Sequence, residues 1–515
     1  MEELKPMTPP MVTPMTAEMV TAGMEAEEKR RADRFGVLII PTVVYAVAFT
    51  FCIYDNFGGI LQAVLALATV IYCRFVEKRM GIATKAGSVV LEVMMVLLGI
   101  STGTTGNGVI QDDNLLGLFL LTLVRLLHNA YSDEKWDLGK YLGSMLSTIG
   151  SALEHIFAPV VDAMAFSKEE KNEKTKTLAA VVVGLLLAVP LLAVVVSLLA
   201  SADIVFLDVL HRVFRLSLLD WFLIAVTFCC GFVASYSGMA AIGTHRVKEE
   251  VKDVKRYPAI VAITTLSLVT VVYMVFSVIQ IVYLFLGNMV LPEDYTYAEY
   301  AREGFFQLLV VCILNVIIVL VVSKRFREHV VLKGLLLLIS ACTYIMGASA
   351  FLRMLMYIDA YHLTRKRILV LWALVTIGLL LVGIVIGIFR QGFPLLRYGM
   401  TVFCLCYLVL AFSHMDYFIA DYNIRQMQAN GELAFEDHDP WYDEGYGTVK
   451  MHYLNSLSSD AAAAFDGIPT GLYGDYRDEV VSTYEEESWR QWNLSHYLAW
   501  KRCKNAGLSK QEVEQ

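Results

Sequence analysis

The chain has 515 residues, of which 57% are apolar and only 18% are charged, and its net charge at neutral pH is −8. Its mean hydropathy of +0.56 exceeds what a soluble protein of this length needs, because about half apolar content already builds an adequate core. The composition therefore excludes an ordinary soluble domain.

Residues 1–35 are rich in Met, Thr, Pro and Glu, and no apolar run precedes residue 36. We expect a disordered N-terminal tail without a cleavable signal peptide, so that the first membrane helix acts as the uncleaved insertion signal. The tail ends in a basic flank made of Lys29, Arg30, Arg31 and Arg34.

Eleven apolar stretches predict transmembrane helices, since about 20 apolar residues are needed to cross a hydrocarbon core of roughly 30 Å. Two of them are weaker, because 87–100 carries Glu92 and 114–127 is short and carries Arg125. A re-entrant or interfacial helix is the alternative for these two. The predicted fold class is all-α, a polytopic transmembrane helical bundle of about eleven helices, with a range of nine to twelve. The nine clear stretches are 36–54, 57–73, 178–200, 216–238, 258–286, 305–322, 332–352, 368–389 and 395–412.

The stretches divide into about four helices within 36–131 and a main bundle of about seven within 177–414. The linker between them, 132–176, has apolar residues every three or four positions, which predicts an amphipathic helix over 137–166 on the inner membrane surface. A soluble helix packed on a neighbouring loop is the alternative. The Gly-rich segment 101–108 predicts a flexible external loop.

Orientation follows from Lys and Arg in short loops, because these residues stay on the cytoplasmic side. The basic flank places the N-terminus in the cytoplasm, and strict alternation over eleven spans places the C-terminus outside. One extra or missing span would place it inside. Arg365, Lys366 and Arg367 break the rule, because alternation puts their loop outside. Either one helix pair is miscounted, or the stretch 353–367 dips into the membrane with its charges paired.

The segment 415–515 predicts an acidic, water-facing C-terminal tail with short helices. From Asp416 onward it carries 18 acidic and 8 basic residues. Such a segment should repel nucleic acid and anionic lipid headgroups, and it offers a docking surface for a protein partner. The bilayer is the other expected partner.

Ionisable residues at membrane depth are the main chemical feature, since a charge there costs about 2.5–3.5 kcal/mol and needs a partner or water. Arg353 and Asp359 are six residues apart, too far to pair with each other along one helix, so each is expected to meet a residue of another helix. A structural ion pair is the preferred interpretation for these two, over a proton or substrate relay, whereas Glu92 and Asp220 could equally reach the membrane interface. Asn315 is expected to bond between helices. No motif for catalysis, a cofactor or a metal is present, so we expect none of these. The residues in question are Glu92, Asp220, Arg353, Asp359 and Asp416.

Several blocks of the second half resemble a bacterial membrane-protein family known only as a domain of unknown function, number 4173, which is allied to number 4153. They are Thr-Tyr-Ala-Glu-Tyr-Ala-Arg-Glu-Gly-Phe-Phe-Gln at 296–307, the segment 349–365, Asp-Tyr-Phe-Ile-Ala-Asp-Tyr-Asn at 416–423, Leu-Ser-Ser-Asp-Ala at 457–461 and Trp-Asn-Leu-Ser at 492–495. The resemblance implies a multi-pass protein of the bacterial plasma membrane and no established reaction.

The polar residues of these blocks lie close to predicted membrane ends, and we expect them to converge on one polar pocket on the outer side. Glu299 and Arg302 are three apart on one helical face and can pair. Tyr297 and Tyr300 suit the headgroup level. The candidate residues are Tyr297, Glu299, Tyr300, Arg302, Arg353, Asp359, Arg365, Asp416 and Asn423.

Three functional classes fit the sequence. The first is a non-enzymatic sensor, binding or scaffold protein of the envelope, favoured because motifs that carry chemistry are missing. A secondary transporter comes second and predicts inverted repeats with broken helices. A membrane-embedded enzyme on envelope or lipid-linked substrates comes third and predicts polar residues that face one cavity.

Overall fold

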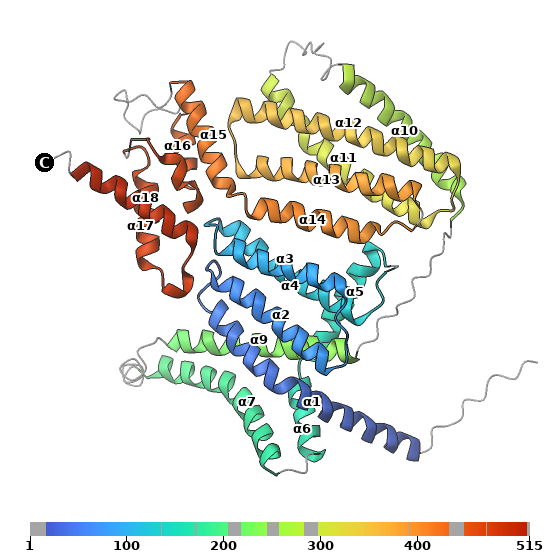
Figure 1. Cartoon of the computed structure of the whole chain (residues 1–515), viewed down its shortest axis with the longest axis vertical. Coiled ribbons are helices and arrows are strands. Elements are labelled where there is room, and N and C mark those ends of the chain that lie inside the picture. The colour runs from blue at the N-terminus through green and yellow to red at the C-terminus, as the bar shows by residue number, and fades with distance from the viewer. Residues whose placement is uncertain are drawn as a thin grey trace, which may run out of the picture. The chain divides into compact units, whose positions relative to one another are not determined.

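The computed structural model describes residues 17–134, 136–169, 173–203, 218–244, 257–282, 297–390, 392–431, 447–469 and 471–511. Throughout these ranges the chain is helical or forms short connections, and an isolated β-bridge joins Tyr257 to Phe326 (Figure 1). The predicted all-α fold is confirmed.

Each of the eleven predicted stretches corresponds, where it is described, to one helix, although some end residues, such as 57–60 before α2, lie in the connections. The helices of the membrane part are α1 (Ala17–Ile53), α2 (Leu61–Arg79), α3 (Ala86–Thr102), α4 (Gly108–Ala130), α5 (Leu138–Glu154), α6 (Ala158–Glu169), α7 (Glu173–Ala202), α9 (Leu218–Thr244), α10 (Ala259–Gln280), α11 (Tyr297–Arg325), α12 (Val330–Tyr361), α13 (Arg365–Phe389) and α14 (Leu395–Ala411). The C-terminal part has α15 (Met415–Ala429), α16 (Gly447–Asn455), η2 (Ser459–Phe465), α17 (Gly474–Glu486), η3 (Trp489–Gln491) and α18 (Leu494–Gln511).

Within the described residues, six helices are long and apolar enough to cross a membrane: α1, α9, α10, α11, α12 and α13. The number rises to eight if two bent pairs, α5 with α6 (57°) and α14 with α15 (56°), each count as one span. The chain is thus a polytopic helical membrane protein, and the count of eleven spans stays a prediction.

The N-terminal segment differs from the prediction. Residues 1–16 lie outside the described part, but α1 begins at Ala17, so the second half of the predicted disordered tail is helical. Good helix-forming residues fill this stretch, and Arg31 pairs with Glu27 one turn earlier. Arg34 binds Asp162 of α6 through two bonds of 2.6 Å.

The linker helix also differs, because two helices replace the single amphipathic helix predicted over 137–166. Pro159 lies in the first turn of α6. Its ring removes a backbone donor and would clash with the carbonyl four residues earlier, so α5 cannot continue through it. Asp162 of α6 is fully buried and also accepts a bond from Tyr236 of α9 at 2.9 Å.

By their contacts the helices form two compact units. Unit 1 contains α1, α6, α7, α9 and parts of α2 and α5, and unit 2 contains the remaining elements. This grouping follows contact and not chain order, so it cuts across the predicted segments 36–131 and 177–414.

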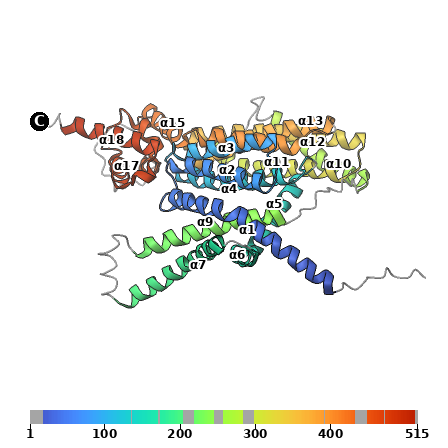
Figure 2. The same ribbon diagram turned by 60° about the horizontal axis from the view of Figure 1, so that its bottom comes forward.

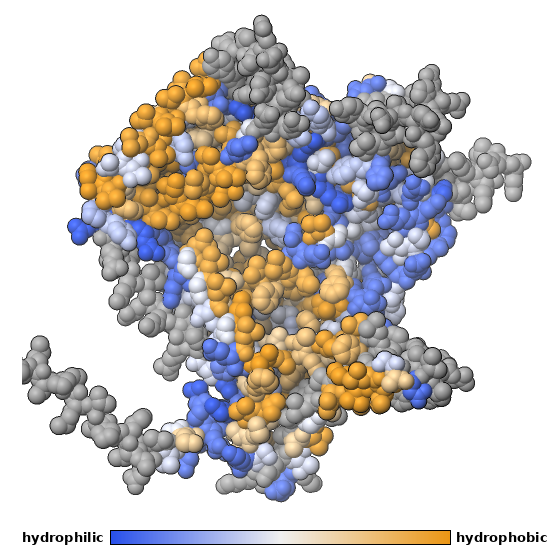
Figure 3. Space-filling view, turned by 180° about the vertical axis from the view of Figure 1, so that it is seen from behind, coloured by the Kyte–Doolittle hydropathy of each residue, from blue (hydrophilic) through white to orange (hydrophobic). Residues whose placement is uncertain are grey.

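Polar contacts join the helices of unit 2. Arg125 of α4, completely buried, donates to Glu92 of α3 at 2.7 Å. Asn315 of α11 accepts from Tyr273 of α10 at 2.8 Å and donates to Thr343 of α12 at 3.0 Å, so the predicted interhelical role is confirmed. Apolar side chains cover the outer surface of α10–α13, and hydrophilic ones gather over the C-terminal helices (Figure 3).

The C-terminal helices α15–α18 form a small domain with its own core. Apolar residues of α15, α16, η2, α17 and α18 make one buried cluster, against which Leu363 and Ile368 also pack. We assign α15 to this domain and not to a span, because it is polar along much of its length and packs on η2. The predicted tail is therefore folded over its described residues.

Candidate functional site

Asp416, the first acidic residue of the C-terminal domain, is fully buried and accepts five hydrogen bonds. Arg365 donates to both carboxylate oxygens, at 2.8 and 2.6 Å. Asn107 donates from the turn before α4 at 3.0 Å, and Ser458 donates from its backbone at 3.1 Å and its hydroxyl at 2.6 Å. One carboxylate thus joins α15, the start of α13, the α3–α4 turn and the start of η2.

Asn423, two turns further along α15, holds the loop between α12 and α13. Its side chain accepts from the Leu363 backbone N–H at 2.8 Å and donates to the Leu363 carbonyl at 2.9 Å. The Arg365 backbone N–H donates to the Tyr453 hydroxyl at 3.1 Å. An asparagine is suited to this position because its amide both donates and accepts, as a strand partner would.

Asp460 is a second buried carboxylate at the same end of the helices. Thr105 Oγ1 and Ser495 Oγ each donate to it at 2.5 Å, and the Gly106 backbone N–H donates at 2.8 Å. His414 Nδ1 lies 3.3 Å away. Burial raises the pKa of Asp460, but the bonds from His414, Ser495, Thr105 and Gly106 outweigh it and leave this pKa below its ordinary value. The same contact raises the pKa of His414 against the opposing effect of its burial.

The segment 490–495 bonds to two connections between membrane helices. The side-chain amide of Asn493, which is fully buried, donates to the backbone carbonyls of Gly58 (2.8 Å), Thr102 (3.0 Å) and Thr105 (2.9 Å). The Leu494 N–H donates to the Gly103 carbonyl and the Ile60 N–H to the Trp492 carbonyl, both at 2.9 Å. The α1–α2 and α3–α4 connections are thereby fixed to the C-terminal domain.

We call this set of contacts the joint: residues 55–60, 101–107, 362–365, 412–416, 458–460 and 490–495. The joint gathers the connections that follow α1, α3, α12 and α14 at one end of the unit 2 helices, where the C-terminal domain lies (Figures 1 and 2). The Gly-rich segment 101–108 was predicted to be flexible, and this was wrong. Thr105 and Asn107 are buried because they bind Asp460 and Asp416.

Two basic residues of the segment 365–367 have partners. Arg365 binds Asp416, and Arg367 lies 4.1 Å above the ring of Tyr357 and donates to the carbonyls of Tyr361 and His362, whereas Lys366 is exposed. The side of the membrane on which this segment lies stays a prediction.

Polar residues also gather at the opposite end of the unit 2 helices. Lys85, just before α3, donates to the carbonyls of His128 and Tyr131 at the end of α4, both at 2.5 Å. Asp133 binds His128 at 2.8 Å and lies 3.5 Å from Arg397 of α14. The connections before α3, after α4 and before α14 therefore meet at the end away from the joint.

The candidate pocket residues fall in different places. Arg365, Asp416 and Asn423 meet in the joint. Arg353 lies inside the helices, where it donates to Gln280 of α10 at 3.1 Å. Asp359 is exposed at the end of α12 and accepts from Gln426 at 3.5 Å. The side chains of Tyr297, Glu299, Tyr300 and Arg302 lie outside the described part, although α11 begins at Tyr297.

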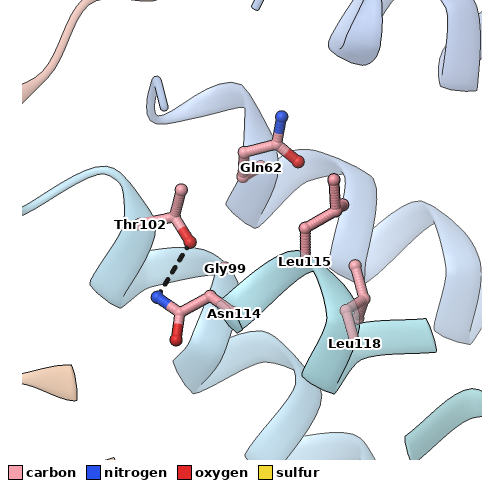
Figure 4. Close-up of a pocket in the computed structure, with 6 residues that line it drawn as sticks. All are labelled: Gln62, Gly99, Thr102, Asn114, Leu115 and Leu118. Atoms are coloured by element: carbon pink, nitrogen blue, oxygen red, sulfur yellow. Dashed lines mark hydrogen bonds between the residues drawn. The ribbon is translucent and has the colours of Figure 1, made fainter. Parts of the chain in front are cut away.

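A small crevice lies between α2, α3 and α4 and is lined by Gln62, Gly99, Thr102, Asn114, Leu115 and Leu118 (Figure 4). It has no room for a water molecule. Asn114 donates to Thr102 across it at 3.1 Å. Among the described residues no group of His, Cys, Asp or Glu could hold a metal ion.

Sequence reasoning missed Thr105, Asn107, His414 and Asn493 as joint residues. Asn493 lies in the Trp-Asn-Leu-Ser block that carried part of the resemblance, so that block was the available signal. Thr105 and Asn107 gave no signal beyond their place among glycines, which suggested flexibility.

The fold and the joint define a polytopic helical membrane protein whose C-terminal domain is bonded to the ends of its helices. The chain belongs to the family described as Domain of unknown function (DUF4153), which matches residues 93–468. The match runs from α3 to just after η2 and includes both buried carboxylates, Asp416 and Asp460. No match was found among curated proteins or among solved structures.

Proposed function

We propose that the protein is a non-enzymatic envelope protein of the bacterial plasma membrane, which presents its docked C-terminal domain outside the cell membrane as a binding or scaffold platform. The observation that carries this proposal is the joint. Asp416 and Asp460 each accept four or five contacts from the chain itself. Such fully bonded carboxylates fix structure and are poorly available for proton transfer.

The sidedness argument combines the joint with the distribution of charge. The basic flank before the first span favours a cytoplasmic N-terminus. If α1, α2, α3, α4, α7 and α9–α14 are the eleven spans, the connections after α1, α3, α12 and α14 all fall outside. These four connections are the ones that the joint gathers, so the C-terminal domain falls outside with them.

A candidate docking face lies on α17. Tyr476 and Val480 point into the domain core. The exposed face of the same helix carries acidic residues that repeat about once per helical turn. Such a face is suited to a basic partner. This face consists of Asp475, Asp478, Glu479, Glu485 and Glu486.

The sidedness is tested by fusing a cytoplasm-active and an export-active reporter in turn after Thr364 and after Gln515. We expect both sites to report the outer side. Opposite sides for the two sites would contradict the joint, and two cytoplasmic sites would contradict the outward platform while leaving the joint intact.

The platform is tested by a photo-crosslinking residue at Glu486 in living cells, with Val272 on the exposed surface of α10 as the matched control. A discrete protein adduct that forms from Glu486 and not from Val272, and that is lost when the acidic face is neutralised, is expected. Equal adducts from both sites, or none from Glu486, would contradict the platform.

A further inference from the structure

Four aromatic side chains of the C-terminal domain form a cluster at its surface, which we call the aromatic cluster: Tyr484, Trp492, Tyr497 and Trp500. The ring of Tyr484 on α17 lies 6.1 Å from that of Tyr497 and 5.0 Å from that of Trp500, both on α18. Trp492 extends the cluster, with its ring 6.5 Å from that of Tyr497. All four side chains are partly exposed, and none of them belongs to the buried core of the domain.

An ammonium group of the chain itself lies on this cluster. Lys504 Nζ is 4.7 Å from the centroid of the Trp500 ring and 3.6 Å from Glu485 Oε1. Trp500 Nε1 donates to the same carboxylate oxygen at 3.4 Å. The negative face of the indole and the carboxylate both attract a cation. The aromatic cluster and Glu485 thus have the chemistry of a site for an alkylammonium group.

The hold on Lys504 is weak. Its side chain is 50% exposed and that of Glu485 is 54% exposed. Ion pairs between such side chains contribute little, and a cation–π contact at an exposed site is weak as well. An ammonium group from another molecule can therefore displace Lys504.

The acidic face of α17 indicates what kind of molecule brings this group. It starts next to the aromatic cluster, at Glu485 and Glu486, and continues back to Asp475. At 1.5 Å per residue this is about 16 Å of helix, a length that about five residues of extended chain can follow. A single lipid headgroup carries one ammonium group and cannot pair with carboxylates along that length, whereas a protein segment with several lysines can.

We infer that the aromatic cluster receives a lysine side chain of a basic protein segment that lies along α17, and that Lys504 occupies the site until this segment binds. The inference names the partner of the proposed platform and rests on that proposal.

The test measures the affinity of a fluorescein-labelled peptide, in which four lysines alternate with Gly-Ser pairs, for the full-length protein in dodecyl maltoside. Fluorescence anisotropy gives the affinity, and the same peptide with acetylated lysines is the control ligand. Lys504→Ala empties the site. Lys501→Ala is the matched control, because it removes the same charge from an exposed position on α18 one turn earlier.

We expect the lysine peptide to bind and the acetylated peptide not to bind. Lys504→Ala should tighten binding of the lysine peptide about three- to tenfold, because no resident ammonium group competes for the ring and the carboxylate. Lys501→Ala should change it by less than about twofold.

Equal tightening in both variants would overturn the inference in favour of diffuse attraction to the acidic surface. Failure of the lysine peptide to bind, or equal binding of the acetylated peptide, would also overturn it. Displacement of the peptide by phosphoethanolamine at an equal or lower concentration would overturn the protein partner in favour of a lipid headgroup.

The inference and the proposed function fail separately. If no protein adduct forms from Glu486 in cells, the platform is wrong even where the peptide binds the purified protein. If both lysine variants tighten binding equally, the ammonium site is wrong and the platform stands.

Discussion

Replacing Asn493 by alanine should release the C-terminal domain from the helix ends. The amide binds three carbonyls and accepts the Ser495 N–H at 2.8 Å. Thr105 O keeps a bond from Gln111 at 2.7 Å and Gly58 O keeps a weaker one at 3.3 Å. The Thr102 carbonyl and the Ser495 N–H lose the bonds described here, at about 1–3 kcal/mol for each buried group.

The expected cost is therefore about 2–6 kcal/mol, which multiplies the open population of the joint by a factor of tens to about ten thousand, because each 1.4 kcal/mol is roughly a factor of ten. Hydrogen exchange measured by mass spectrometry on the detergent-solubilised protein reads this directly in peptides that cover 55–62 and 101–107. Asn505→Ala is the matched control, since Asn505 is exposed on helix α18, which begins directly after Asn493.

Asn493→Ala should accelerate exchange in both peptides, whereas Asn505→Ala should leave both at the wild-type rate. If the two variants exchange at the same rate, Asn493 does not hold the joint closed and the reasoning from its buried bonds is wrong. Acceleration confined to α18 would show that only the local helix depends on it.

Three further outcomes are expected. Asp416→Asn should lower the free energy of unfolding of the solubilised protein, measured in urea, by about 3 kcal/mol, because it leaves the partly buried guanidinium of Arg365 without its carboxylate. The control Asp421→Asn, which breaks a surface pair, should change this free energy by less than about 1 kcal/mol. Gly99→Ala should lower the same free energy of unfolding by about 1–3 kcal/mol, since the new Cβ would lie 2.7 Å from backbone atoms of α2. The control Gly334→Ala, whose Cβ would lie in open space on α12, should raise it slightly. The protection factor at 101–107, which is the intrinsic exchange rate at each pH divided by the measured rate, should be highest between about pH 4.5 and 6.5. Asp460, with its lowered pKa, stabilises the joint until acid protonates it, and His414, with its raised pKa, stabilises it until alkali deprotonates it. His414→Asn should abolish only the loss of protection on the alkaline side, and an unchanged alkaline loss would refute the role of this pair.

Hydropathy predicted the helices because each membrane helix must satisfy its own backbone polar groups, and this requirement is local in sequence. The stretches that form α3 and α4 were the two weakest predictions, because hydropathy takes account only of residues that are close in sequence. Glu92 and Arg125 each lower the apolar character of their own stretch, yet they form one buried pair 33 residues apart in sequence. A hydropathy window along the sequence counts each charge as unfavourable for a membrane helix. In the fold the two charges neutralise each other as one ion pair.

The joint was only partly predictable for the same reason. Asp416, Asn423 and Arg365 were proposed as site residues from the motif blocks that resemble a family. The partner Asn107 lies 309 residues from Asp416, and a Gly-rich context suggested flexibility. The glycines have another use: at Gly106 a Cβ would overlap the Ser459 hydroxyl, so a side chain there would displace Ser459 from its place in the joint.

The order of the joint along the chain bears on how the protein assembles. The connections at 55–60 and 101–107 emerge first during synthesis, whereas Asn493 and Asp460, which bind them, are made after every span. Domains generally fold from the N-terminus onward as the chain is made, but here the early connections obtain these protein partners only when the last helices arrive. Closure of the joint is therefore possible only when the chain has crossed the membrane the correct number of times. A span inserted in error would carry Asp416 and Asp460 to the side opposite Asn107 and Thr105, and it would leave both carboxylates without the donors that bury them.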